Sequence, residues 1–156
     1  MATTKSGYCN GSDMLLYVSG KAAGHCSTHT TTLNSETKDH SVKPVSTKLI
    51  TSGLWKGKTV TGLSISISAE GLVFYDETEC GFKELFALWK AGKPVAVKCM
   101  EREATKSYLE GNFVISSLEQ VNPAQDDATY SLSLDNSEEP SLLDESALTE
   151  TTTTGE

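Results

Sequence analysis

The sequence contains a single arginine, Arg102, and 12 lysines, and its basic residues do not cluster in any segment. Proteins that bind nucleic acid tightly need clustered Lys and Arg to displace counterions from the phosphates. The longest uninterrupted apolar run, residues 14–18, is far shorter than the roughly 20 residues that a membrane-spanning helix needs. It is also too short for the apolar core of a secretory signal peptide. We therefore expect neither tight nucleic-acid binding nor a membrane span, and a chain that stays in the cytoplasm where it is made.

Recognisable catalytic and metal-binding motifs are also missing. There is no phosphate-binding glycine loop, no nucleophile elbow, no H-E-x-x-H and no C-x-x-C pair. His25, Cys26 and His29 form the only cluster of ligand-type residues, but on a strand residues four apart are about 13 Å apart and cannot share one zinc ion. We expect no metal, no cofactor, no enzymatic activity and four free thiols: Cys9, Cys26, Cys80 and Cys99.

The 156 residues carry a net charge of -8 that is unevenly distributed. Residues 1–100 contain 11 Lys and 8 acidic residues, whereas residues 101–156 contain 13 acidic residues against Arg102 and Lys106. From residue 137 onward there is no basic residue and little apolar content. This composition predicts one domain over residues 1–136, followed by a disordered acidic tail over residues 137–156 that would keep assemblies apart by repulsion.

Strand patterns dominate the domain, in which Ser and Thr are abundant. Residues 14–18, a Ser19-Gly20 turn and residues 22–33 predict a β-hairpin. Residues 34–58 show little periodicity and are a candidate interaction arm. After them, Leu63, Ile65 and Ile67 alternate with serines, which predicts a strand with one buried and one wet face.

Residues 79–91 change to a helical period. Phe82, Leu85, Phe86 and Trp89 share one side, and we expect this stripe to pack against a sheet. Gly92 supplies a C-terminal cap, and Pro94 prevents continuation.

Three further strands are predicted after the helix. The first two contain Val95, Val97 and Cys99, and then Leu109 to Ile115, with a bulge at Ser116-Ser117. A last strand follows the turn-rich residues 122–126 and carries alternating apolar side chains: Tyr130, Leu132 and Leu134.

The order of these elements, and several local sequences, resemble the major tail tube proteins of long-tailed bacteriophages. The resemblance covers about residues 12–136. The matching segments are Leu16-Tyr17-Val18-Ser19-Gly20-Lys21-Ala22-Ala23-Gly24-His25, Thr28-His29-Thr30, Ser35-Glu36-Thr37-Lys38-Asp39, Leu54-Trp55, residues 62–72, Leu85 with Gly92-Lys93-Pro94-Val95, residues 111–119 and residues 128–134. The four cysteines and the acidic tail are departures from the family pattern.

This resemblance implies a mainly β fold, a β-sandwich or partial barrel with one flanking helix. Subunits would form hexameric rings whose sheets join into one continuous β-barrel, and the rings would stack into a virion tail tube. Its expected partners are other copies of itself, a tape-measure protein, tail terminator and initiator proteins, and double-stranded DNA that passes through without specific binding.

Three residue sets follow as expectations. The assembly arm, residues 37–58, would make ring or subunit contacts through Lys38, Asp39, Lys43, Pro44, Val45, Leu54 and Trp55. The helix would pack through Phe82, Leu85, Phe86 and Trp89. A strand lining the lumen or a subunit interface would present His25, Thr28, Thr30, Ser64 and Ser66.

Two other functions remain open at this stage. One is an inner-tube component of a contractile tail or injection machine, which would need a sheath partner. The other is a decoration protein or a small β-module that binds carbohydrate, for which clustered exposed aromatic residues would be expected.

Overall fold

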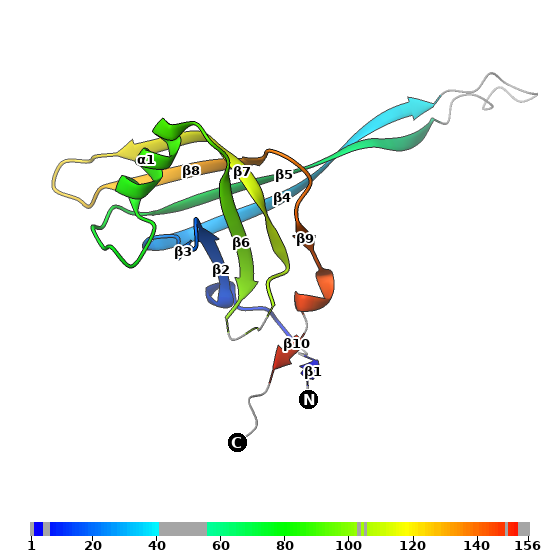
Figure 1. Ribbon diagram of the computed structural model, residues 1–156, viewed down its shortest axis with the longest axis horizontal. Coiled ribbons are helices and arrows are strands. Elements are labelled where there is room, and N and C mark those ends of the chain that lie inside the picture. Colours follow the sequence, from blue (N-terminus) through cyan, green and yellow to red (C-terminus); the bar gives the residue numbers. More distant parts are fainter. Residues whose placement is uncertain are drawn as a thin grey trace, which may run out of the picture.

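The structure, a computed structural model, describes residues 2–4, 7–40, 56–102, 104, 106–148 and 150–152. An eight-stranded antiparallel sheet has the order β3-β2-β6-β7-β8-β5-β4, and β9 also pairs with β7. A separate two-stranded sheet joins β1 and β10 (Figure 1). The strands are β1 Ala2–Thr4, β2 Met14–Val18, β3 Lys21–Ala22, β4 Cys26–His40, β5 Gly57–Leu72, β6 Val95–Glu101, β7 Leu109–Val121, β8 Thr129–Asn136, β9 Leu142–Leu143 and β10 Glu150–Thr152; α1 spans Phe82–Ala91, and two 3-10 turns are η1 Gly11–Asp13 and η2 Glu145–Leu148.

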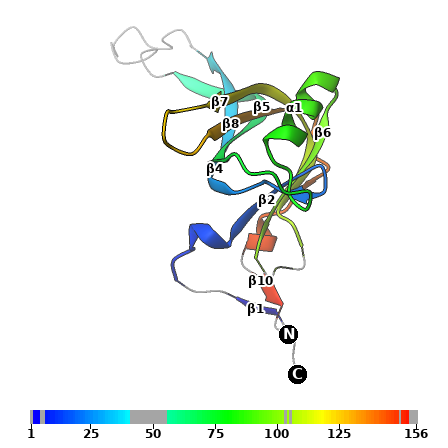
Figure 2. The ribbon, with the colours of Figure 1, turned by 90° about the vertical axis from the view of Figure 1, so that its left-hand side faces the viewer.

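The large sheet consists of two halves that fold over each other and share the long strand β7. Residues 109–113 of β7 pair with β6, and residues 113–121 pair with β8. A register shift between Ile115 and Ser117 confirms the bulge predicted there. The half formed by β2 and β6 crosses in front of β8, β5 and β4 (Figures 1 and 2). No hydrogen-bonded pairing joins β2 to β4 within the described residues, so the expected partial barrel is confirmed as an open one.

The core fills the space between the two halves. The alternation predicted for β6 and β8 is confirmed, since the inward residues of both strands are buried. Ile65 and Ile67 are buried as expected, but Leu63 on the same strand is 77% exposed. The most deeply buried side chains are Tyr130, Phe113, Ile67, Leu85, Leu109, Leu132, Leu134, Val18, Val97, Cys80 and Cys99.

The Tyr130 side chain ties the two halves together at one corner. Its hydroxyl donates a 2.6 Å hydrogen bond to the carbonyl of Gly24, which lies 106 positions earlier in the sequence. The ring lies over Gly71, where a Cβ atom would meet Tyr130 Cε1 at 2.9 Å and the His25 carbonyl oxygen at 2.6 Å. Only glycine permits this approach, so Gly71 is required by packing.

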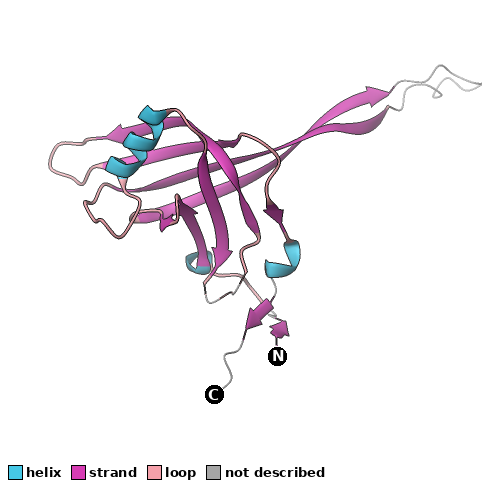
Figure 3. Ribbon diagram, viewed as in Figure 1, coloured by secondary structure: helices cyan, strands magenta, loops and turns pink. Residues whose placement is uncertain are grey.

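Helix α1 begins and ends as its sequence predicts. The Gly81 N–H donates to the Glu84 carboxylate at 3.0 Å, and Gly92 takes a left-handed conformation with φ of 67°. Figure 3 shows α1 in cyan beside the strands. Its predicted packing stripe is partly wrong. Leu85 is 1% exposed and Phe82 packs against the core, but Phe86 and Trp89 are 50% and 51% exposed.

The reason is geometric. Successive helical residues are rotated by about 100°, so a short helix at the margin of the sheet cannot bury a stripe as wide as the one predicted. Leu88 is the residue that lies partly buried against the core instead.

The predicted first hairpin and the irregular arm are corrected. β3 ends at Ala22, and the following strand β4 does not continue the hairpin but pairs with β5. Residues 34–40, predicted to lack regular structure, belong to β4, and β5 begins at Gly57. The Thr and charged side chains of residues 34–40 show no hydrophobic periodicity, because both faces of this part of β4 are exposed.

The predicted disorder after residue 136 is also wrong for the described part of this segment. β9 pairs with the start of β7, and Ala147 in η2 is 4% exposed. The short pairing with a strand of the large sheet orders this segment, although the composition of the segment alone predicts disorder. In the described part of the chain, no helix is both long and apolar enough to span a membrane.

We predict that Tyr130→Phe lowers the free energy of unfolding by about 1–2 kcal/mol, because the buried Gly24 carbonyl would lose its donor. Tyr75→Phe is the matched control, since Tyr75 is 80% exposed. Urea unfolding followed by circular dichroism measures both. Equal unfolding midpoints for the two variants would contradict the structural role of this hydrogen bond.

Candidate assembly surfaces

Four neighbouring strands, β4, β5, β8 and β7, present one outward face made almost entirely of hydroxyl and carboxylate side chains. The pairing registers place these side chains in three consecutive rows across the strands. We call this surface the hydroxyl face. Its rows are Thr28, Glu70, Ser131 and Glu119; Thr30, Ser68, Ser133 and Ser117; and Thr32, Ser66, Asp135 and Val114.

The hydroxyl face carries negative charge and none of the rows contains a basic or aromatic residue. Its side chains are short, so the surface offers neither cationic groups for phosphates nor platforms on which bases could stack. At one end it is bordered by Leu72, Thr129 and Val121, where the two aliphatic residues are 43% and 49% exposed. Such a surface repels DNA weakly and gives it no specific contact.

The predicted lumen residues are largely brought together here. Thr28 and Thr30 lie in the first and second rows, Ser66 lies in the third, and Ser64 continues the same face opposite Asn34. His25 does not belong to it. That residue precedes β4 with φ of 45°, its ring lies 4.2 Å from that of Phe74, and its Nε2 lies 3.7 Å from Glu79 Oε2.

Both lateral edges of the hydroxyl face are open in the described chain. β4 pairs with β5 on one side and has no strand partner on its other side over 15 residues. The part of β7 that follows the bulge pairs with β8 and has no partner on its other edge. Long unpaired edges invite another strand in a neighbouring chain.

The hairpin of β4 and β5 continues beyond the rest of the sheet (Figure 1), and we extend the name arm from residues 37–58 to its whole projecting part, which includes the described residues 33–40 and 57–65. β8 stops pairing with β5 at Ser66, and the Ile65 N–H is instead accepted by the Asn136 side-chain oxygen at 3.0 Å. From this point β5 has only β4 as a neighbour. The arm is therefore a two-stranded ribbon, which is marginally stable on its own and gains from a partner surface.

One face of the arm is aliphatic. Leu33 lies opposite Ile65, so it shares the face that is buried inside the domain, and Leu63 follows on that face opposite Ser35. A bulge between Glu36 and Thr37 shifts the register so that Val60, opposite Thr37, lies on this same face. Leu33, Val60 and Leu63 are 68%, 56% and 77% exposed. The face that is buried within the domain thus continues along the arm, where no other element of the described chain covers it.

The charged residues predicted for the arm have a minor role in its own structure. Lys58 Nζ lies 3.9 Å from Asp39 Oδ1, and both side chains are more than half exposed, so this ion pair contributes little. Lys38 lies opposite Thr59 and is exposed. The other predicted contact residues lie outside the described residues: Lys43, Pro44, Val45, Leu54 and Trp55.

The ligand-type residues at the start of β4 do not converge. Cys26 donates to the Thr28 carbonyl, and burial raises the pKa of its thiol. Burial lowers the pKa of His29. This residue pairs with Ala69 of β5 and shares the core face of β4. Among the residues described, no group of three His, Cys, Asp or Glu side chains is placed to hold a metal ion.

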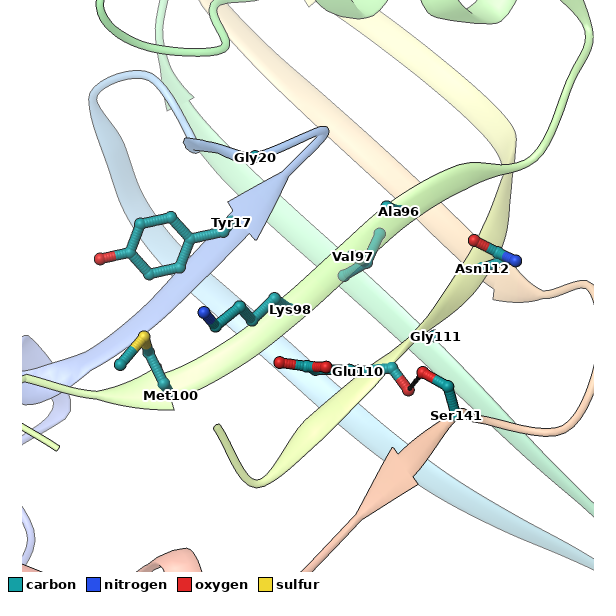
Figure 4. Close-up of a pocket in the computed structure, with 10 residues that line it drawn as sticks. All are labelled: Tyr17, Gly20, Ala96, Val97, Lys98, Met100, Glu110, Gly111, Asn112 and Ser141. Atoms are coloured by element: carbon teal, nitrogen blue, oxygen red, sulfur yellow. Dashed lines mark hydrogen bonds between the residues drawn. The ribbon is translucent and has the colours of Figure 1, made fainter. Parts of the chain in front are cut away.

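An open hollow of about 460 Å³ lies on the outward side of β2, β6 and β7 (Figure 4). Tyr17, Lys98 and Glu110 cross its floor as one row of paired strands. The Ser141 hydroxyl donates to the Glu110 carbonyl at 3.2 Å at its margin. These residues are spread along a surface rather than directed at one point, so the hollow is an open concavity and not a ligand pocket.

The sequence matches the family model described as phage tail tube protein over residues 8–141. No curated protein matches it. Among solved structures, the tail of an empty gene transfer agent (GTA) particle, refined with C6 symmetry, superposes with a TM-score of 0.70 at 20% identity, covering 86% of this chain and 98% of that one.

Two further structures share the fold. A chain of the native GTA virion gives a TM-score of 0.66 at 18% identity, covering 85% of this chain and 97% of that one. The sheath/tube terminator of an extracellular contractile injection system gives 0.56 at 13% identity, covering 85% and 95%. The fold is thus one that tail tubes use. The chain belongs to the phage tail tube protein family and is a structural component of the virion tail.

Proposed function

We propose that this chain assembles head-to-tail into hexameric rings, that the rings stack into the tail tube, and that the hydroxyl face lines its channel. The observation that carries the proposal is the pair of open edges on one continuous polar face. Joining the β4 edge of one subunit to the β7 edge of the next is a heterologous contact, which closes into a ring when the rotation permits. The C6 symmetry of the GTA tail of the same fold supports six subunits.

A channel lined by short hydroxyl and carboxylate groups suits passage of double-stranded DNA without binding. Glu70, Glu119 and Asp135 would oppose close approach of phosphates, and serine and threonine would give only weak contacts. The role is structural rather than catalytic. A tape-measure protein would fill the channel before the DNA, and terminator or initiator proteins would end the tube.

The aliphatic face of the arm is the natural contact between rings or between subunits. It projects from the domain, where another copy can cover Leu33, Val60 and Leu63. Covering one exposed leucine removes apolar surface worth about 1.5–3 kcal/mol.

The same fold occurs in a contractile injection system, which supports an inner tube within a sheath as a second candidate. Co-purification of a sheath protein with the assembled tube would favour that candidate, and bare tubes in virions would exclude it.

The purified protein at high concentration is expected to form hollow tubes or six-fold rings in negative-stain electron micrographs. The double variant Leu33→Thr, Leu63→Thr should fold with unchanged stability, because both side chains are exposed, and should raise the concentration needed for assembly about tenfold or more. Ser64→Thr, which changes the other face beside Leu63, is the control. Normal tubes from the double variant would contradict the role of the arm face.

The lining of the channel is tested by size-selective labelling. In a Cys9→Ser, Cys26→Ser background, Ser68→Cys in assembled tubes should react with a small maleimide but not with a maleimide on a large polyethylene glycol chain. Lys98→Cys, on the outward side of the other half of the sheet, should react with both reagents. Equal reaction of Ser68→Cys with the large reagent in tubes and in monomers would place the hydroxyl face outside the channel.

A further inference from the structure

Two large aromatic side chains on α1 lie outside the core of one subunit. Phe86 and Trp89 are each half exposed, and their ring centroids are 6.2 Å apart. Phe82 lies 6.2 Å from Phe86 on the inner side and anchors the pair to the core. Two adjacent large aromatic residues in this position form a projecting apolar knob, which is the kind of side-chain group that dominates protein interfaces.

A hollow lies on the β4 side of the molecule. It measures about 780 Å³ and lies where β2 and β4 fail to pair, so it follows from the open barrel. We call it the seam. Its walls come from η1, β2, the start of β4 and Tyr108, and its apolar lining includes Leu15, Ala23 and Cys26.

The knob and the seam lie at opposite ends of the proposed ring contact. Helix α1 packs against β7, whose free edge forms one side of the hydroxyl face. The seam adjoins β4, whose free edge forms the other side. Figure 1 shows α1 beside β7 and β8 in the upper part of the view, with β2 and the start of β4 below them. Joining the β7 edge of one subunit to the β4 edge of the next would bring the α1 side of the first subunit toward the seam side of the second.

We infer that Phe86 and Trp89 of one subunit insert into the seam between β2 and β4 of the next copy. The knob fills the hollow that the open barrel leaves, so each subunit completes the barrel wall of its neighbour. The partner is a second copy of this chain, in head-to-tail order. This inference rests on the proposed ring assembly and adds a contact in the outer layer, separate from the pairing of strands in the inner one.

Covalent trapping tests the contact directly. Cys9 and Cys26 are replaced by serine, while Cys80 and Cys99 stay because burial raises the pKa of each thiol to about 11 and keeps it unreactive. Lys90→Cys beside the knob and Ser12→Cys at the seam are then introduced together. A short bismaleimide should give a ladder of covalent oligomers that ends at the closed ring. Each single-cysteine variant should stop at dimers or monomers.

The control pair is Lys90→Cys with Glu145→Cys, because Glu145 in η2 does not line the seam. A ladder from the control pair, or tubes that give no ladder with Ser12→Cys, would overturn the inference while leaving the tube function intact. Failure of the parent protein to form rings or tubes would instead count against the proposed function.

A second variant tests whether the contact contributes to the free energy of ring assembly. Phe86→Ala with Trp89→Ala should keep the thermal unfolding midpoint within a few degrees of the parent and raise the concentration needed for ring formation about tenfold or more, since aromatic anchors carry much of an interface. Lys83→Ala, also exposed on α1, should assemble like the parent. Assembly of the double variant at the parent concentration would overturn the inference.

Discussion

The buried hydrogen bond from Tyr130 to the Gly24 carbonyl holds the corner on which the open barrel depends. It joins the start of β8 to the segment that links β3 to β4, and the absence of a side chain at Gly71 leaves room for the tyrosine ring. From this corner β4 leaves the first hairpin and runs along β5. Within the described residues β2 and β4 do not pair, so β4 keeps an open edge and the seam lies beside it.

Period-two patterns made much of the fold predictable. β6 and β8 alternate buried and exposed residues along their length, and the serines of β5 marked the polar face before any pairing was known. The first hairpin was mispredicted because a threonine-rich strand with two polar faces carries no signal for which neighbour it will join. Its partner is set by contacts between segments far apart in sequence, among them the Tyr130–Gly24 hydrogen bond and the close approach at Gly71.

The assembly surfaces were less predictable for a physical reason. Thr28, Thr30 and Ser66 could be assigned to a polar face, but Ser131, Ser133 and Glu119 join them only through the registers of β8 and β7. Leu33 was missed because its face depends on its register opposite Ile65, and Val60 because the bulge between Glu36 and Thr37 returns it to that face. The helical stripe predicted the burial of Leu85 correctly. It did not predict that Phe86 and Trp89 are exposed, because the width of the contact between helix and sheet depends on tertiary packing and not on the local sequence.

A single subunit leaves three features exposed: a 15-residue strand with one unpaired edge, the aliphatic face of the arm, and a pair of aromatic side chains. Such features are hazards for a monomer, because they invite uncontrolled pairing. They are tolerable when each has one geometrically matched site on another copy. The acidic hydroxyl face presents no such feature within its rows, which is the asymmetry that a tube needs: adhesive at its subunit contacts and inert along its channel.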